Sequence, residues 1–423
     1  MKLLTISTKN TMLYICILML CLLILARDIM GIGVPGMAFA VMVATAAFIL
    51  KLDKFKIFLF FLFPFTCGVP GYTMLVSIIF LVAKSLGTVS IRSLQIFPIV
   101  FVALLELFNC SIHVGDVDLS AYASFISFTA VFFFILFDKS NYDQSRECVI
   151  AFIFGTIFVA AVIYYKMITD SGLDAILNGD LRNVMDTLNE EGVDNLGTNA
   201  NNIAYLSIIL ISTLLMGAKK LRLSPILYTS LFILSVLIGM GSFSRTWMFL
   251  FVLIIVVYLI HQRNHKALFS LVLIFGAFII LFPNILDGFT NVMKDRLTHD
   301  NIATGGGRTL IFSEFNELWS KRILYIIFGT SVTLYYDVLH CSHAMHNSIQ
   351  QIYVCTGIMG LFLYSYCSLS FFKVKYKGDK TLMNYLPFFA GIIFLMSIQF
   401  LRPYFLMLPI IPAFYAYLVR EEK

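Results

Sequence analysis

The residue types best suited to chemistry gather in residues 287–360, a long polar segment followed by an apolar run. Within it, Gly305, Gly306 and Gly307 stand directly before Arg308. Consecutive glycines let neighbouring backbone N–H groups face one anion, and a guanidinium adds positive charge beside them. A flexible hinge would use the same glycines. No Gly-Lys-Ser/Thr sequence follows, so the pattern indicates a candidate anion site other than a nucleotide P-loop.

Three histidines recur at every third position, at His340, His343 and His346, just before the apolar run. An imidazole titrates near neutral pH, so His346, which is followed by Asn347, is a candidate general base for a hydroxyl group. His343 is its nearest rival. A histidine that caps the next helix or bonds Asn347 is the structural alternative. Zinc is a weaker alternative because no second ligand cluster accompanies the histidines, and we therefore expect no metal.

Arginines elsewhere in the chain are candidate partners for an anion. Arg245 lies between two apolar runs with almost no loop, where a charge is costly and usually functional unless it snorkels to headgroups. Arg182 lies in a polar segment, and Arg402 lies between the last two apolar runs. The planar fork of arginine grips phosphate or carboxylate at two points, which lysine cannot do.

The elements that must position these residues are membrane helices. The chain has 423 residues, of which 60% are hydrophobic and 13% charged, whereas soluble domains are roughly 45–50% apolar and about 25% charged. Many apolar runs reach the ~20 residues of a spanning helix, and they do not alternate as strands of an outer-membrane barrel do. We therefore predict an all-α, polytopic integral membrane bundle of about 12–14 transmembrane helices, forming a single domain over residues 1–423.

Basic residues predict the orientation of the bundle. They cluster in four groups, at residues 51–56, 219–222, 263–266 and 373–380. All four groups fall on one side if segment 57–83, broken by Pro64 and a Gly-Val-Pro-Gly turn, crosses the membrane an even number of times. That segment fits two short helices, one kinked helix or a re-entrant pair. By the positive-inside rule the basic side is cytoplasmic, and it holds both termini.

The opposite, outer side then carries an acidic loop at 169–200 and a large loop with short helices at 287–345. Of the 18 lysines only three fall on this side, whereas seven of the 12 arginines do. Topology disfavours both residue types outside, so the excess of guanidinium groups indicates an anionic ligand at the outer leaflet. Pairing with loop acids or lipid headgroups is the alternative.

One spacing in this region resembles a known family. His346-Asn347 is followed by nine residues and then by Gly357 and Gly360, glycines that let a neighbour pack closely. Together with Gly-Gly-Arg at 306–308 and Ser-Arg at 244–245, this pattern resembles the O-antigen ligase and polymerase superfamily, the WaaL and Wzy proteins. The predicted topology, with one dominant periplasmic loop late in the chain, resembles that family over nearly the whole sequence.

The resemblance implies glycosyl transfer from an undecaprenyl-diphosphate-linked oligosaccharide in the bacterial inner membrane, without a metal or other cofactor. Arg308 and Arg245, with Arg182 and Arg402, would bind the diphosphate. His346 would take the proton from the acceptor sugar, and the anomeric carbon would be inverted. Expected partners are the lipid-linked oligosaccharide, membrane lipids and a chain-length regulator protein, with no nucleic acid.

Three functions stay open at this point. The favoured one is a polysaccharide polymerase that joins repeat units into O-antigen or capsule. A ligase that moves the finished glycan to lipid A-core would use the same donor. A flippase or proton-coupled transporter is the third, because Glu106 lies inside an apolar run where an acid could bind an ion or relay protons. A hydrogen bond from Glu106 to a neighbouring helix is the structural alternative.

Overall fold

The computed structural model describes residues 8–86, 93–113, 117–138, 144–172, 200–242, 244–262, 313–317, 320–340, 345, 347–373, 382–398 and 404–419. All regular elements in these ranges are helical, and none of the residues in them forms a strand. Six of the helices are long and apolar enough to cross a membrane. The predicted all-α membrane bundle is thus confirmed at the level of its class, while the span count of about 12–14 stays a prediction.

The six long apolar helices fall along the whole chain. They are α1 (Thr8–Asp28), α5 (Ser93–His113), α6 (Leu119–Leu136), α7 (Ser145–Ser171), α13 (Arg245–Gln262) and α19 (Ser348–Lys373). Shorter elements lie between them: α2 (Gly36–Ile49), α3 (Leu52–Leu62), η1 (Phe63–Gly68), α4 (Tyr72–Leu86), α10 (Ala200–Leu214), α11 (Ala218–Leu221), α12 (Pro225–Gly241), α17 (Ile323–Phe328), α18 (Tyr335–Leu339), α20 (Leu382–Leu395), η4 (Tyr404–Ile410) and α21 (Ile411–Ala416).

The proline-broken segment 57–83 forms a hairpin. Helix α3 continues through the 3-10 turn η1, and α4 then runs back. At the tip of the hairpin, Arg27 donates a hydrogen bond of 2.6 Å from Nη1 to the Gly68 carbonyl. At its base, Lys84 donates from Nζ to the Leu50 carbonyl at 3.0 Å. The segment therefore goes out and returns within the bundle, so that its two ends lie close together. An even number of membrane crossings stays a prediction.

Polar contacts tie several helix ends together at one end of the bundle, which we call the lysine end. Lys56 and Asp138 form a buried ion pair between α3 and the residues after α6. Arg146 donates to the Lys220 carbonyl at 2.7 Å, and Lys220 donates to Asn384 Oδ1 at 2.8 Å. Since a charge buried in lipid needs a partner, these bonds let the basic residues sit among packed helix ends.

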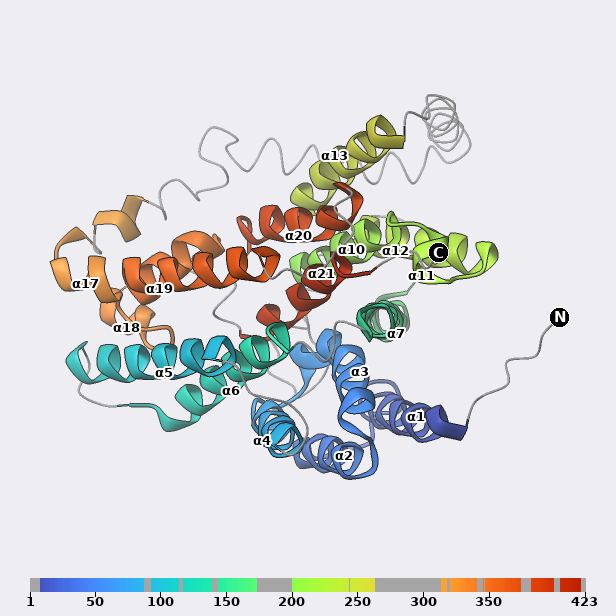
Figure 1. Cartoon of the computed structure of the whole chain (residues 1–423), viewed down its shortest axis with the longest axis horizontal. Coiled ribbons are helices and arrows are strands. Elements are labelled where there is room, and N and C mark those ends of the chain that lie inside the picture. Colours follow the sequence, from blue (N-terminus) through green and yellow to red (C-terminus); the bar gives the residue numbers. More distant parts are fainter. Residues whose placement is uncertain are drawn as a thin grey trace.

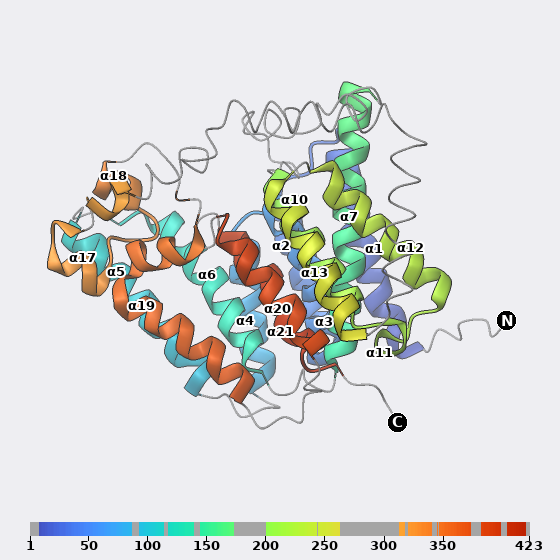
Figure 2. The ribbon, with the colours of Figure 1, turned by 90° about the horizontal axis from the view of Figure 1, so that it is seen from above.

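The opposite end, which we call the arginine end, holds Arg27 in the last turn of α1 and Arg245 at the start of α13. In Figure 2 the helices run between these two ends, with α5, α17, α18 and α19 on one side of the molecule and α1, α7 and α12 on the other. Helix α21 lies between the two groups and contacts both α6 and α7 (Figure 1). Tyr415 on α21 donates to the Ile135 carbonyl at 2.7 Å, which fixes this central position.

Candidate functional site

The structure describes four of the predicted site residues: Arg245, Asn347, Gly357 and Gly360. Five others lie outside the described residues: Arg182, Arg308, His343, His346 and Arg402. The four described positions all concern how α13 and α19 begin or bend. The geometry therefore defines the framework next to the predicted catalytic and diphosphate-binding residues.

Asn347 starts the longest helix of the second half of the chain. Its Oδ1 accepts hydrogen bonds from the backbone N–H groups of Ile349 at 3.0 Å and Gln350 at 3.1 Å. This is an N-cap, and it satisfies donors that the first turn of α19 would otherwise leave free. Residue 346 immediately precedes the cap in the sequence. The Asn of the His-Asn pair thus has a structural task, which is to begin the helix directly after the histidine.

Helix α19 is broken at Gly357. This glycine has φ +64° and ψ −167°, outside the helical region, and a Cβ there would overlap the backbone of Ile327. Across the contact, Gly329 has φ +84°, and a Cβ there would overlap the backbone of Cys355. The expected close packing at Gly357 is present, and its partner is the end of the short helix α17. Glycine is needed on both sides because two backbones touch.

Gly360 serves the same break from within the helix. The atoms nearest to a Cβ at this position all belong to the side chain of Thr356, one turn earlier. In a continuous α-helix the Cβ atoms of residues i and i+4 lie about 5–6 Å apart. The side chain of Thr356 lies much closer than that to the Cβ position of Gly360, because the helix is bent between them. The two glycines of the motif therefore allow α19 to change direction while α17 packs into the bend.

The break leaves backbone carbonyls of α19 without their helical donors, and a short segment satisfies them. Residues 329–334, which we call the hook, pair with α19 through Thr330 N–H to Val354 O at 2.9 Å and Ser331 N–H to Cys355 O at 3.2 Å. From α5, Asn109 Nδ2 donates to Phe328 O at 2.8 Å. Irregular backbone inside a membrane bundle requires such internal bonding. Part of the predicted 287–345 loop thus enters the bundle between α5 and α19.

Glu106 on α5 anchors the hook. Its carboxylate accepts from the N–H groups of Val332 at 2.8 Å and Thr333 at 2.9 Å, and from the hydroxyls of Ser331 at 2.7 Å and Thr333 at 2.8 Å. The residue is only 2% exposed. Three of these donors bond to Oε1, and the Val332 N–H bonds to Oε2, so the hook holds both oxygens of the carboxylate. Glu106 thus makes hydrogen bonds, as its structural alternative expected, and its partners are residues 331–333 of the hook.

Arg245 is held at a junction of four helices. It is half-buried, and two residues later Trp247 donates from Nε1 to Ser207 Oγ on α10 at 3.0 Å. The Trp247 ring lies where a Cβ of Gly239 on α12 would be. From α7, Tyr164 donates to the Ile238 carbonyl at 2.6 Å. This packing fixes the start of α13, and with it Arg245, at the arginine end.

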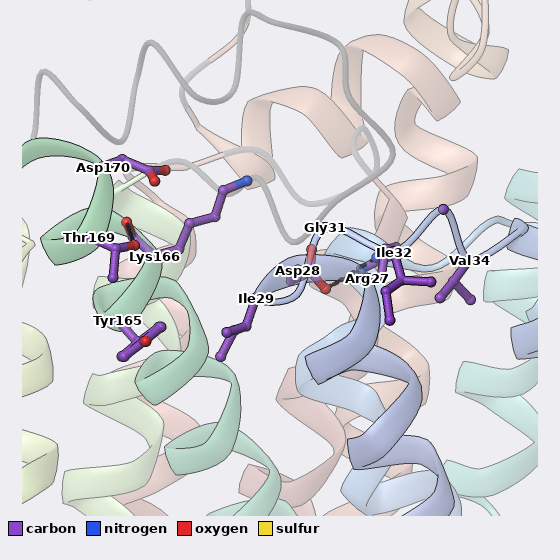
Figure 3. Close-up of a pocket in the computed structure, with 11 residues that line it drawn as sticks. Arg27, Asp28, Ile29, Gly31, Ile32, Val34, Tyr165, Lys166, Thr169 and Asp170 are labelled. Carbon is purple, nitrogen blue, oxygen red and sulfur yellow. Dashed lines mark hydrogen bonds and ion pairs between the residues drawn. The ribbon is translucent and has the colours of Figure 1, made fainter.

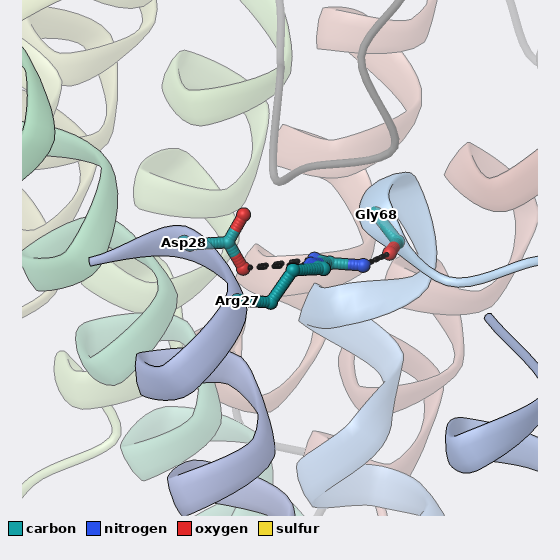
Figure 4. A network of polar contacts seen from close by, with 3 residues as sticks. All are labelled: Arg27, Asp28 and Gly68. Carbon is teal, nitrogen blue, oxygen red and sulfur yellow. Dashed lines mark hydrogen bonds and ion pairs between the residues drawn. The ribbon is translucent and has the colours of Figure 1, made fainter. Parts of the chain in front are cut away.

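Arg27 shows how an arginine at this end is used for structure. Its Nε and Nη2 donate to Asp28 Oδ2 at 3.1 Å and 2.8 Å, and Nη1 donates to Gly68 O (Figure 4). The guanidinium also lies 4.8 Å from the centre of the Phe39 ring. All three nitrogen atoms of the guanidinium therefore donate hydrogen bonds, and Arg27 joins α1 to η1. Arg27 fits the alternative interpretation of the arginines on the predicted outer side, in which they pair with acids.

A cavity of about 500 Å³ opens beside this clamp, between α7 and the connection from α1 to α2 (Figure 3). Its polar lining comes from Arg27, Asp28, Lys166, Thr169 and Asp170. Its apolar lining comes from Ile29, Ile32 and Val34. The sequence did not predict this cavity. The sequence carries only a weak signal for it: an apolar connection after Arg27 and Asp28, and the spacing of four residues between Lys166 and Asp170.

Replacing Gly357 with alanine is expected to destabilise the protein by more than the ~1–3 kcal/mol that this glycine-only backbone conformation costs another residue, because the Cβ also overlaps Ile327. Gly172 is the matched control, since it has φ +77° and open space around its Cβ position. The apparent Tm of the detergent-solubilised variants measures the difference. Equal losses in Gly357→Ala and Gly172→Ala would show that the α17 contact adds nothing.

Fold and framework together define a class: a helical membrane protein in which a broken helix and a loop segment are joined inside the bundle. Comparison with protein-family models, curated proteins and solved structures found no match. Among the described residues, no three His, Cys, Asp or Glu side chains gather as a metal site would require.

Proposed function

We propose that this protein is a polysaccharide polymerase of the O-antigen ligase and polymerase superfamily. It joins undecaprenyl-diphosphate-linked oligosaccharide units into O-antigen or capsule at the outer leaflet of the bacterial inner membrane. One observation carries this proposal: each described residue of the His346-Asn347…Gly357…Gly360 pattern has a definite task in α19. Asn347 caps the helix, and the glycines bend it around α17. A pattern that shapes the backbone so closely is suited to holding the preceding histidine in one place.

In the proposed reaction, a hydroxyl oxygen of the acceptor sugar attacks the anomeric carbon of the donor. His346 takes the hydroxyl proton as the new C–O bond forms. The bond from the anomeric carbon to the phosphate oxygen breaks, and undecaprenyl diphosphate leaves with the electron pair. Arg308 and Arg245, with Arg182 and Arg402, stabilise the charge that grows on the diphosphate. A single displacement inverts the anomeric carbon and uses no cofactor.

The orientation follows from the charges at the two ends. The lysine end carries Lys51, Lys54, Lys84 and Lys220, and by the positive-inside rule it faces the cytoplasm together with both termini. The arginine end, where Arg245 and Asn347 lie, then faces the periplasm. Lipid-linked repeat units, a membrane of ordinary lipids and a chain-length regulator protein are the partners of this arrangement.

The alternatives differ in how they fit. A ligase that transfers glycan to lipid A-core would use the same framework and the same donor, so the acceptor decides between them. A flippase or proton-coupled transporter has less support, because the buried Glu106 that suggested it bonds the hook to α5.

The deciding experiment supplies purified, lipid-reconstituted protein with undecaprenyl-diphosphate-linked repeat units. We expect a ladder of lengthening lipid-linked chains, with a narrower length distribution when a chain-length regulator is added. A parallel reaction offers lipid A-core as the acceptor. Transfer to lipid A-core without lengthening would identify a ligase. Movement of the lipid across the bilayer with neither product would identify a flippase.

A further inference from the structure

The cavity beside Arg27 lies at the level of the lipid headgroups. Helix α7 has 27 residues, which gives it a length of about 40 Å, whereas the hydrocarbon core is about 30 Å thick. Its first turns belong to the lysine end, where Arg146 reaches the Lys220 carbonyl. The last turns, with Lys166 and Asp170, therefore reach beyond the hydrocarbon into the headgroup zone.

Two cations and two anions among the described residues line the cavity, at Arg27, Asp28, Lys166 and Asp170. Arg27 and Asp28 neutralise each other in the floor, with side chains only 7% and 1% exposed. Lys166 is half-buried and Asp170 is exposed, and neither side chain has an ion-pair or hydrogen-bond partner in the described part of the chain. In Figure 3, Lys166 extends from α7 toward the α1–α2 connection. These residues are four apart on α7, so their side chains are neighbours on one helix face.

The rim of the cavity is apolar. Next to the lining residues Ile29 and Ile32, Met30 is 69% exposed, and Ile32 itself is 50% exposed. Gly31 and Gly33 have open space at their Cβ positions, so the backbone of this connection is also accessible. An apolar rim beside the Lys166 ammonium fits an amphiphile whose head is polar and whose tails lie along the bundle. A free sugar or a soluble anion would gain nothing from such a rim.

We propose that this cavity binds the headgroup of a membrane aminophospholipid, with its phosphate on Lys166 and its primary ammonium on Asp170. A phosphate accepts charge-assisted hydrogen bonds from the lysine, and a primary ammonium donates to the carboxylate. A choline headgroup carries the same two charges but has no N–H group to donate. A phosphoglycerol headgroup lacks the cation. The proposal uses none of the residues assigned to glycosyl transfer, and its test requires no glycan donor.

The test measures the apparent Tm of the full-length protein in detergent while short-chain phosphatidylethanolamine, phosphatidylcholine or phosphatidylglycerol is titrated. A ligand that binds only the folded state raises the Tm, and the rise grows with the logarithm of the ratio of its concentration to its Kd. We expect phosphatidylethanolamine to bind about tenfold more tightly than the other two lipids. Lys166→Ala should weaken all three lipids, while Asp170→Asn should remove only the preference for ethanolamine. Lys54→Ala, which removes a half-buried lysine at the opposite end, should leave the preference intact.

Several results would overturn the proposal. Equal affinity of the wild type for the three lipids would show that Asp170 does not bind the ammonium group. Unchanged affinity for all three lipids in Lys166→Ala, or an unchanged preference for phosphatidylethanolamine in Asp170→Asn, would place the lipid elsewhere. An equal loss of affinity in Lys54→Ala would do the same. Stabilisation by soluble glycerophosphoethanolamine that matches the full lipid would show that the apolar rim plays no part. Stabilisation by an oligosaccharide alone, lost in Lys166→Ala, would make the cavity a glycan site.

Discussion

Replacing His346 with alanine is expected to lower the rate of glycan lengthening by at least about a hundredfold, the usual loss when a general base is removed. Without the imidazole, the attacking hydroxyl must lose its proton to water, while binding of the donor through the arginines is unaffected. The rate of chain extension in the reconstituted assay measures this loss. The apparent Tm should stay close to that of the wild type, because the variant keeps Asn347, which caps α19.

The other two histidines of the row provide the comparison. His340 is exposed and adopts a left-handed conformation with φ +52°. His340→Asn is therefore the control, because asparagine tolerates this backbone conformation. It should extend chains at the wild-type rate. Full activity in His346→Ala together with no activity in His343→Ala would transfer the role of base to His343. Activity in both alanine variants would remove the row from the mechanism.

The class of the fold was predictable because apolar runs near the length of a spanning helix are visible in any single stretch of sequence. The long runs that became α5, α6 and α7 needed no information from the rest of the chain. Segment 57–83 was harder, since Pro64 and the following turn allowed three arrangements. Long-range contacts distinguish them: Lys84 bonds to Leu50 and brings the two ends of the segment together, while Arg27 bonds to Gly68 at its tip.

The internal framework was not predictable for the same reason. Glu106 is bonded to residues more than 220 positions later in the chain, and no local pattern indicates that pairing. The break in α19 is equally hidden, because an apolar run with two glycines fits a continuous packed helix as well as a bent one. The positive φ at Gly357 follows from the approach of α17, a contact that depends on tertiary structure.

Replacing Glu106 with leucine is expected to cost about 3–5 kcal/mol of stability, because it leaves a group of buried donors without an acceptor. The affected donors are the N–H groups of Val332 and Thr333 and the hydroxyls of Ser331 and Thr333. Glu106→Gln should lose less, since one amide oxygen can still accept while the NH₂ group faces other donors. Unfolding in detergent, followed by the apparent Tm, ranks the three proteins.

Glu147, which is exposed on the first turn of α7, is the matched control, and Glu147→Gln should change stability by no more than about 0.5 kcal/mol. The same variants separate the two classes of function. If the hook positions the start of α19 for glycosyl transfer, chain extension should fall in step with the loss of stability at Glu106. If Glu106 instead carried protons in a transporter, Glu106→Gln would retain the wild-type Tm and lose only transport. A wild-type Tm in Glu106→Leu would show that the hook is held by its bonds to α19 alone.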